Sequence, residues 1–205
     1  MRISSKSFEH GQRIPATFAM GAPDGFGGNR NPQLSWSEVP AEAKSLVLLC
    51  VDPDAPTDPS LVGKEGVEIP VAHPRGQFAH WAVVDIAPDV CEIAEGSCSD
   101  GVTKRGKQNP DGPSGARQGR NDYTGWFAGD ADLGGDYFGY DGPYPPPNDL
   151  RVHRYFFRLF ALDVAKLDLP DGFTTADVQR AVQGHVIAEA ATYGTYTLNA
   201  KANAP

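Results

Sequence analysis

The sequence predicts a mainly β protein of the α+β type: an antiparallel β-sandwich with one substantial C-terminal helix and short peripheral helices. Short runs rich in β-branched and aromatic residues recur along the chain, and segments dense in glycine, proline, asparagine and aspartate separate them. No internal repeat is visible. With 205 residues, the chain suits a single domain, residues 1–205, that can bury its own core.

Three runs predict the central strands. Residues 45–51 are continuously apolar, which is typical of a strand that is covered on both faces, and they lead directly into Asp52. Residues 78–86 and residues 152–162 are rich in aromatic and β-branched side chains, so each of these runs also predicts a strand.

The period of two in a strand predicts which side chains share a face. In the second run it places His80 on the same side as Ala82 and Val84. In the third run it places His153 and Tyr155 on one face, as expected for two residues in the wall of a pocket.

The late part of the chain predicts the substantial helix. Thr174 begins a helix-start pattern with an acidic residue three positions later, and valines then recur at the spacing i, i+4, i+8. This pattern predicts an amphipathic helix near residues 175–192 that ends close to Gly194. Residues 195–198 are then expected to form a final short strand.

Charge and cysteine content exclude several classes of function. The net charge of −8 argues against a protein that neutralises a nucleic-acid backbone. Residues 1–20 contain no apolar stretch long enough for a signal-peptide core or a membrane span, so we expect a cytoplasmic protein. Three cysteines are an odd set; Cys50 lies in an apolar run, and Cys91 and Cys98 are too far apart for a usual pair of metal ligands. No cofactor or metal is predicted.

Polar residues at the strand ends form a candidate site. The prolines around Asp52 and Asp54 restrict the backbone, so both carboxylates could be presented stiffly just after a strand. A rigid turn whose aspartates bond their own backbone is the alternative. Together with His80, His153 and Tyr155, these carboxylates could line a concave binding site.

Four motifs resemble the phosphatidylethanolamine-binding protein family, and especially its bacterial Raf kinase inhibitor-like branch. They occur in the family's order, and the resemblance covers about residues 3–200. The motifs are Asn31-Pro-Gln-Leu-Ser-Trp36, Asp52-Pro-Asp-Ala-Pro56, His80-Trp81, and Gly142-Pro-Tyr-Pro-Pro146 followed by His153-Arg-Tyr155.

The resemblance implies a β-sandwich with few helices and a small surface pocket for a phosphate-like anion, a phosphorylated small molecule or a phospholipid head group. It also suggests a homodimer and implies no catalytic residue. The ligand-binding residues that it implies are Asp52, Asp54, His80, His153 and Tyr155, with Gly142, Pro143 and Pro145 in the rim loop.

Two departures from the family pattern concern the pocket rim. Residues 126–138 resemble an insertion, and residues 146–153 lack the glycine usually found there. The acidic stretch from Asp130 to Asp141 partly imitates a calcium loop, but it lacks an expected oxygen ligand and the terminal glutamate, which favours a solvated acidic turn. The long segment 101–150 is expected to contribute to the site.

Three functions are compatible with these residues. The first is a non-enzymatic binding protein in which protonated His80 or His153 and the Tyr155 hydroxyl donate to phosphate oxygens, while Asp52 stabilises an imidazolium. The second is an inhibitor of a protein kinase or protease that acts by protein–protein contact. The third is a weak hydrolase that uses Asp52 with His80 or His153, although the sequence has no nucleophile motif such as Gly-x-Ser-x-Gly.

Overall fold

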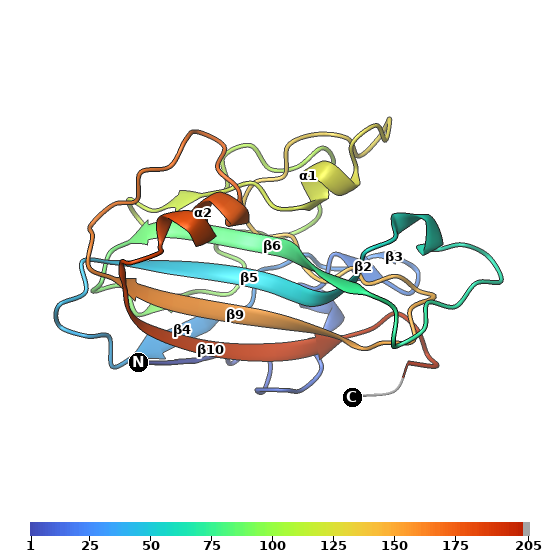
Figure 1. Ribbon diagram of the computed structural model, residues 1–205, viewed down its shortest axis with the longest axis horizontal. Helices are drawn as coiled ribbons and strands as arrows, with labels where there is room; N and C mark the ends of the chain where they lie inside the picture. The colour runs from blue at the N-terminus through green and yellow to red at the C-terminus, as the bar shows by residue number, and fades with distance from the viewer. Residues whose placement is uncertain (203–205) are drawn as a thin grey trace.

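Two sheets and a helix pack in layers in the computed structural model, which describes residues 1–202 (Figure 1). The larger sheet has the strand order β10-β9-β5-β6-β8, and each neighbouring pair is antiparallel. Its strands are β5 (Ser45–Pro56), β6 (Arg75–Ile86), β8 (Arg117–Gln118), β9 (His153–Leu162) and β10 (Val186–Tyr196).

The smaller elements complete the layers. A three-stranded sheet has the order β1-β4-β7, and β2 and β3 form a hairpin. These strands are β1 (Arg2–Ser4), β2 (Gly21–Ala22), β3 (Gly25–Phe26), β4 (Leu34–Ser37) and β7 (Glu92–Ile93). The helices are the short 3-10 turns η1 (Ala16–Phe18) and η2 (Pro59–Leu61), and the α-helices α1 (Tyr123–Trp126) and α2 (Thr175–Ala181).

The hydrophobic core lies on both faces of the larger sheet. On one face, Trp36 and Ile93 of the smaller sheet pack with Trp81 and Leu159 of the larger one. On the other face, α2 covers the sheet through Val178 and its neighbours. Burial on both faces explains why the first predicted run is continuously apolar.

The mainly antiparallel β fold is confirmed, and so are the three predicted central strands. Strand β5 extends past residue 51, its predicted end, and β6 begins at Arg75, three residues before its predicted start. Strand β9 covers residues 153–162, close to the predicted range of 152–162. Within residues 1–202, none of the helices combines the length and apolar character needed to cross a bilayer.

The prediction for the late helix is wrong beyond residue 181. Helix α2 has seven residues, and Thr174 caps it as the sequence predicts. Gly184 then adopts a φ of 83°, a left-handed conformation that ends a helix easily because glycine has no Cβ. The chain returns as β10, which pairs along β9, so the short strand expected at 195–198 is replaced by the eleven-residue strand Val186–Tyr196.

The three cysteines are expected to differ in reactivity because their burial differs. Cys50 and Cys98 are buried, and burial raises the pKa of both thiols, whereas Cys91 is exposed. A soluble thiol reagent should therefore modify Cys91 in the folded protein, and Cys50 and Cys98 only after unfolding. Mass spectrometry of the labelled peptides with and without denaturant checks this; rapid labelling of Cys50 in the native protein would contradict the fold around β5.

Candidate ligand-binding pocket

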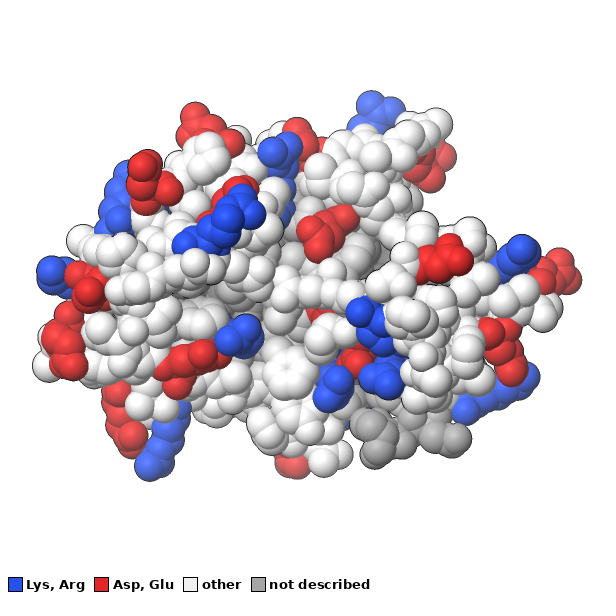
Figure 2. Space-filling view, viewed as in Figure 1, with Lys and Arg blue, Asp and Glu red and all other residues white. Residues whose placement is uncertain are grey.

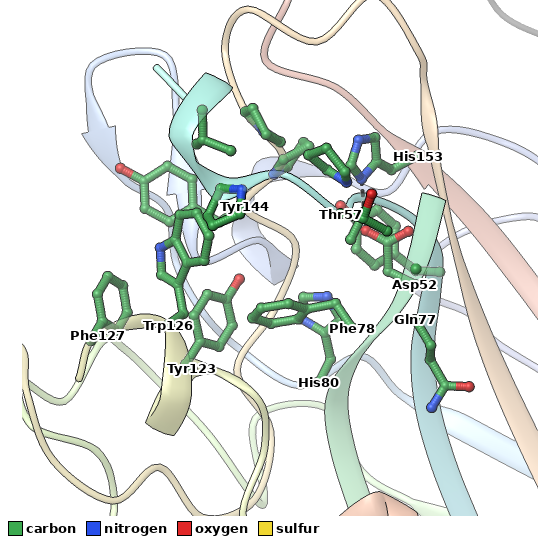
Figure 3. Close-up of a pocket in the computed structure, with 18 of the residues that line it drawn as sticks. Asp52, Thr57, Gln77, Phe78, His80, Tyr123, Trp126, Phe127, Tyr144 and His153 are labelled. Carbon is green, nitrogen blue, oxygen red and sulfur yellow. Dashed lines mark hydrogen bonds and ion pairs between the residues drawn. The ribbon is translucent and has the colours of Figure 1, made fainter. Parts of the chain in front are cut away.

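A cavity of about 560 Å³ opens beside the ends of β5, β6 and β9 (Figure 3). The segment after β5, helix α1 and the proline-rich rim loop 142–147 enclose it. Five of the residues predicted for the site lie in its wall: Asp52, His80, Pro145, His153 and Tyr155. Sequence segments about a hundred residues apart therefore meet at one place.

Asp54 does not line the cavity, although it was predicted with Asp52. The pairing of β5 with β6 shifts register between Asp52 and Ala55, and the N–H of Asp54 donates to Asp52 Oδ1 over 2.7 Å. Asp54 is buried and forms ion pairs of 2.8 Å with Arg151 and with Arg154. The two interpretations of the proline-flanked segment, a rigid turn and a polar pocket wall, therefore both apply to Asp52. Its carboxylate accepts a hydrogen bond from the local backbone, and it also lines the cavity.

Gly142 and Pro143 also lie outside the cavity wall and shape the rim loop. The N–H of Gly142 donates to Asn29 Oδ1 over 2.8 Å, and its carbonyl accepts a hydrogen bond of 2.7 Å from the Tyr123 hydroxyl. A Cβ at this position would lie 2.1 Å from the Phe18 carbonyl oxygen, so the close approach requires glycine. The carbonyl of Pro143 accepts the N–H of Gly21 over 2.9 Å.

A bulge in β6 places His80 in the cavity. Cys50 opposes Trp81 and Val51 opposes Ala79, so His80 is the additional residue between these two pairs. The His80 ring lies 5.1 Å from the Tyr155 ring, whereas Ala82 packs with the cluster on the opposite face of the sheet. The prediction that His80 shares a side with Ala82 and Val84 is therefore wrong, because simple alternation does not hold across a bulge.

His80 is a neutral imidazole with one nitrogen left for a ligand. A carbonyl oxygen can only accept, so Nδ1 must donate in its 2.8 Å hydrogen bond with the Asp141 carbonyl. Burial lowers the pKa of His80, and this outweighs the nearby carboxylate of Asp52. Nε2 makes no hydrogen bond to any residue among 1–202 and is an acceptor while His80 is neutral.

His153 is a cation held between two carboxylates. Nδ1 donates to Asp52 Oδ2 over 2.7 Å, and Nε2 donates to Asp149 Oδ2 over 3.0 Å. Burial alone would lower the pKa of His153, but the charges and hydrogen bonds of Asp52 and Asp149 outweigh it and raise the pKa to about 9. Both nitrogens are committed, so His153 has no free N–H for an anion, unlike the donor expected from the sequence.

Asp149 is a site residue that sequence reasoning did not identify. Arg75 donates to it through two nitrogens, at 2.5 Å and 3.1 Å, and the N–H of Arg151 donates to it over 2.9 Å. Burial raises the pKa of Asp149, but the hydrogen bonds from His153 and Arg75 dominate and lower it to about 2. The sequence does contain a signal for Asp149: it is an acidic residue four positions before His153, within residues 146–153, which lack the glycine usually found there in the family.

Tyr155 presents an unpartnered hydroxyl. The side chain is 1% exposed, and its oxygen is buried without a hydrogen-bond partner among the described residues. Burial raises the pKa of this phenol well above its usual value, so the group remains an O–H donor. A buried hydroxyl without an acceptor costs free energy, which a ligand oxygen would recover.

Aromatic side chains form the other side of the cavity, and the sequence did not predict them as site residues. Figure 3 shows Tyr123, Trp126 and Phe127 on one side, Asp52 and His153 on the other, and Phe78 and His80 between them. Trp126 and Phe127 belong to the predicted insertion; Trp126 is the last residue of α1, and Phe127 follows it as the C-cap. The long segment 101–150 therefore contributes to the cavity wall.

The acidic stretch 130–141 is held by the protein's own groups. Asp130 Oδ1 accepts the N–H groups of Asp132 and Leu133, as in a local turn, and Asp136 pairs with Arg120. Asp141 accepts hydrogen bonds from Asn29, Asn121 and Lys107. Across residues 1–202, His, Cys, Asp and Glu side chains form no group of three or more that could hold a metal ion.

The fold and the cavity define a β-sandwich with a mixed polar and aromatic pocket at one end of its larger sheet. The sequence model of the family described as "Phosphatidylethanolamine-binding protein" matches residues 4–197, so the chain belongs to the phosphatidylethanolamine-binding protein family.

Relatives and solved structures agree with this assignment over nearly the whole chain. A UPF0098 protein of Methanothermobacter thermautotrophicus is 36% identical over 96% of this chain and 98% of its own length, and UPF0098 protein YbhB of Escherichia coli is 30% identical over 93% and 96%. The crystal structure of Escherichia coli YbcL aligns with a TM-score of 0.71 at 26% identity, covering 96% and 97% of the two chains. The structure of CT736 from Chlamydia trachomatis aligns with a TM-score of 0.65 at 33% identity, covering 95% of each.

The two pocket histidines are expected to titrate on opposite sides of the ordinary histidine pKa. NMR signals of the His153 ring should titrate near pH 9, and those of His80 below pH 6.5. Because the pKa of His153 is raised on folding, its contribution to the free energy of unfolding is complete below about pH 6.5 and is lost as pH rises through 9. That loss is on the order of 3 kcal/mol for a shift of this size.

Asp149→Asn tests this stabilisation directly. Urea unfolding of wild type and variant should show a stability difference that is largest near pH 6.5 and shrinks towards pH 9.5, since the variant lacks one of the two carboxylates that hold the imidazolium. A constant difference across this pH range would show that Asp149 does not stabilise a charged His153.

Proposed function

We propose that this protein is a non-enzymatic binding protein whose pocket takes the phosphate group of a small phosphorylated molecule or a phospholipid head group. The unpartnered Tyr155 hydroxyl in the wall of the cavity carries the proposal. Because its pKa is raised, this hydroxyl keeps its proton and can donate, and a phosphate oxygen is a strong acceptor. His80 Nε2 is the second contact, since protonation would turn it into a charged donor beside Tyr155.

The charges around the polar end of the cavity are compatible with an anion. His153 and Arg75 carry two positive charges, and Asp52 and Asp149 carry two negative ones, in one connected group of hydrogen bonds. An incoming phosphate therefore meets a balanced group rather than bare carboxylates. Each of these buried charges is hydrogen-bonded to a group of opposite charge, and these bonds hold it in a fixed position.

The same hydrogen bonds favour binding over hydrolysis. Asp52 accepts from His153 and from the N–H of Asp54, and both nitrogens of His153 are committed. A general base needs a free lone pair within reach of the attacking group. His80 Nε2 offers one, but among residues 1–202 the pocket wall presents no serine or cysteine nucleophile beside it.

Tyr155→Phe is expected to weaken phosphate binding roughly tenfold to a hundredfold, the cost of one hydrogen bond to a charged group. Calorimetric titration with inorganic phosphate and glycerol phosphate measures the change. Tyr193→Phe is the matched control, because Tyr193 lies outside the cavity wall. Equal affinities of wild type and Tyr155→Phe for phosphate would contradict the proposal that the anion binds in this pocket.

Sulfate affinity should rise as pH falls below about 6.5, because His80 gains a proton on Nε2 and becomes a donor. The pKa of His80 is lowered by burial, so the rise should come at a pH below the ordinary histidine midpoint. Sulfate is the suitable probe since its own charge is constant across this range. In His80→Gln the pH dependence should disappear, and a profile unchanged by this substitution would assign the titration to another group.

A further inference from the structure

The aromatic side of the pocket continues into a second cavity. This cavity has a volume of about 600 Å³ and shares Pro59, Phe78 and Trp126 with the first one. Its wall also includes Asp122, which lies directly before α1. The two cavities are therefore two halves of one furrow, with Phe78 and Trp126 at the junction.

The rings at this junction are held in a fixed array. Phe78 and Tyr123 meet edge to face with 4.9 Å between ring centroids, and Tyr123 stacks on Phe127 at 5.6 Å. The Tyr123 hydroxyl is bound to the Gly142 carbonyl, which fixes the ring orientation. Trp126 is 44% exposed, so part of its indole faces the mouth of the furrow.

Asp122 is a carboxyl group beside these rings without an ion-pair partner in the described part of the chain, and burial raises its pKa above the ordinary value. One carboxylate oxygen accepts the N–H of Ala79 over 2.7 Å, and Asp122 forms no ion pair with any residue from 1 to 202. The cation nearest in the cavity wall, Arg120, is bound to Asp136 and to the Gly172 carbonyl. On this face of the molecule, Figure 2 shows mostly uncharged side chains around the hollow, with both acidic and basic groups at its edge.

We propose that Phe78, Trp126 and Asp122 form a subsite for a methylated ammonium group, so that the pocket selects choline-type phosphate esters over ethanolamine-type ones. This inference rests on the proposed function, because the phosphate of the same ligand binds at Tyr155 and His80. Aromatic faces attract a cation through the ring quadrupole, and a quaternary ammonium suits them best because it carries no N–H groups.

A primary ammonium fits this subsite less well. It brings three N–H donors, of which Asp122 can accept some, while the faces of Phe78 and Trp126 accept none strongly. Donors left without acceptors lose the hydrogen bonds that they make in water. The selectivity therefore comes from the aromatic wall, and the Asp122 carboxylate adds attraction for either cation.

Calorimetry with four soluble probes tests the subsite: phosphocholine, phosphoethanolamine, inorganic phosphate and 3,3-dimethylbutyl phosphate, the isostere of phosphocholine in which a neutral carbon replaces the ammonium nitrogen. Phosphocholine should bind roughly 3- to 30-fold more tightly than the isostere, the range expected for cation–π attraction, and more tightly than phosphoethanolamine. Equal affinity for the isostere, or tighter binding of phosphoethanolamine, would overturn the proposal.

Trp126→Leu is the informative variant, because the exposed indole can be replaced without opening the core. It should strongly reduce the preference for phosphocholine over phosphoethanolamine, which the aromatic wall supplies, and leave the affinity for inorganic phosphate unchanged. Phe26→Leu is the control, since Phe26 is an exposed aromatic residue, 46% exposed, outside both cavity walls. A preference for phosphocholine over phosphoethanolamine that is undiminished in Trp126→Leu would overturn the subsite.

The inorganic phosphate arm separates the two proposals. Phosphate binding that is lost in Tyr155→Phe, without a preference for phosphocholine, keeps the anion site and rejects the ammonium subsite. Absence of binding by every phosphate probe rejects both. Co-sedimentation with phosphatidylcholine vesicles distinguishes the two sources of the choline group. Binding to free phosphocholine but not to vesicles indicates a soluble ester, and binding to both indicates a lipid head group. Each of these results supports the subsite.

Discussion

The buried imidazolium of His153 is the constraint on which the rest of the pocket depends. A buried cation is stable only where its charge is compensated, and here carboxylates from two different segments compensate it. Asp52 ends the apolar part of β5, whereas Asp149 follows the rim loop and is itself held by Arg75 at the start of β6. Three separate segments are thus fixed around one ring. Asn148 extends the connection, because its amide donates to backbone carbonyls in the segment after β5.

This arrangement decides which groups are free to recognise a ligand. His153 stabilises the pocket and fixes Asp52, but both of its N–H groups are already hydrogen-bonded to carboxylates. In the proposed function, recognition depends on Tyr155, two residues further on the same face of β9, and on His80, which the bulge in β6 turns towards it. A regular β6 would direct His80 to the opposite face, so the bulge is as important to the site as the identity of the residue.

The sequence predicts the features that depend on local patterns, including the central strands, the start of α2 and the strand positions of His80, His153 and Tyr155. It does not predict features that depend on competition between distant segments. The valine spacing after Thr174 fits a helix, but pairing with β9 and the left-handed Gly184 favour a strand. The roles of Asp149 and Trp126 depend on tertiary contacts that no spacing in the sequence specifies.

The two sides of the pocket rest on different clusters of side chains. Tyr155 belongs to the large cluster between the two sheets, whereas Tyr123 and Phe127 pack with Met20 and Tyr137 in a small separate cluster. The aromatic wall is therefore supported in part by segment 126–138, the predicted insertion, through Phe127 and Tyr137. Changes in that segment can alter the space and chemistry beside the polar end without disturbing the packing that holds His153 and Tyr155. Under the proposed function, the polar end selects the charged group of the ligand, and segment 126–138 shapes the space for the group attached to it.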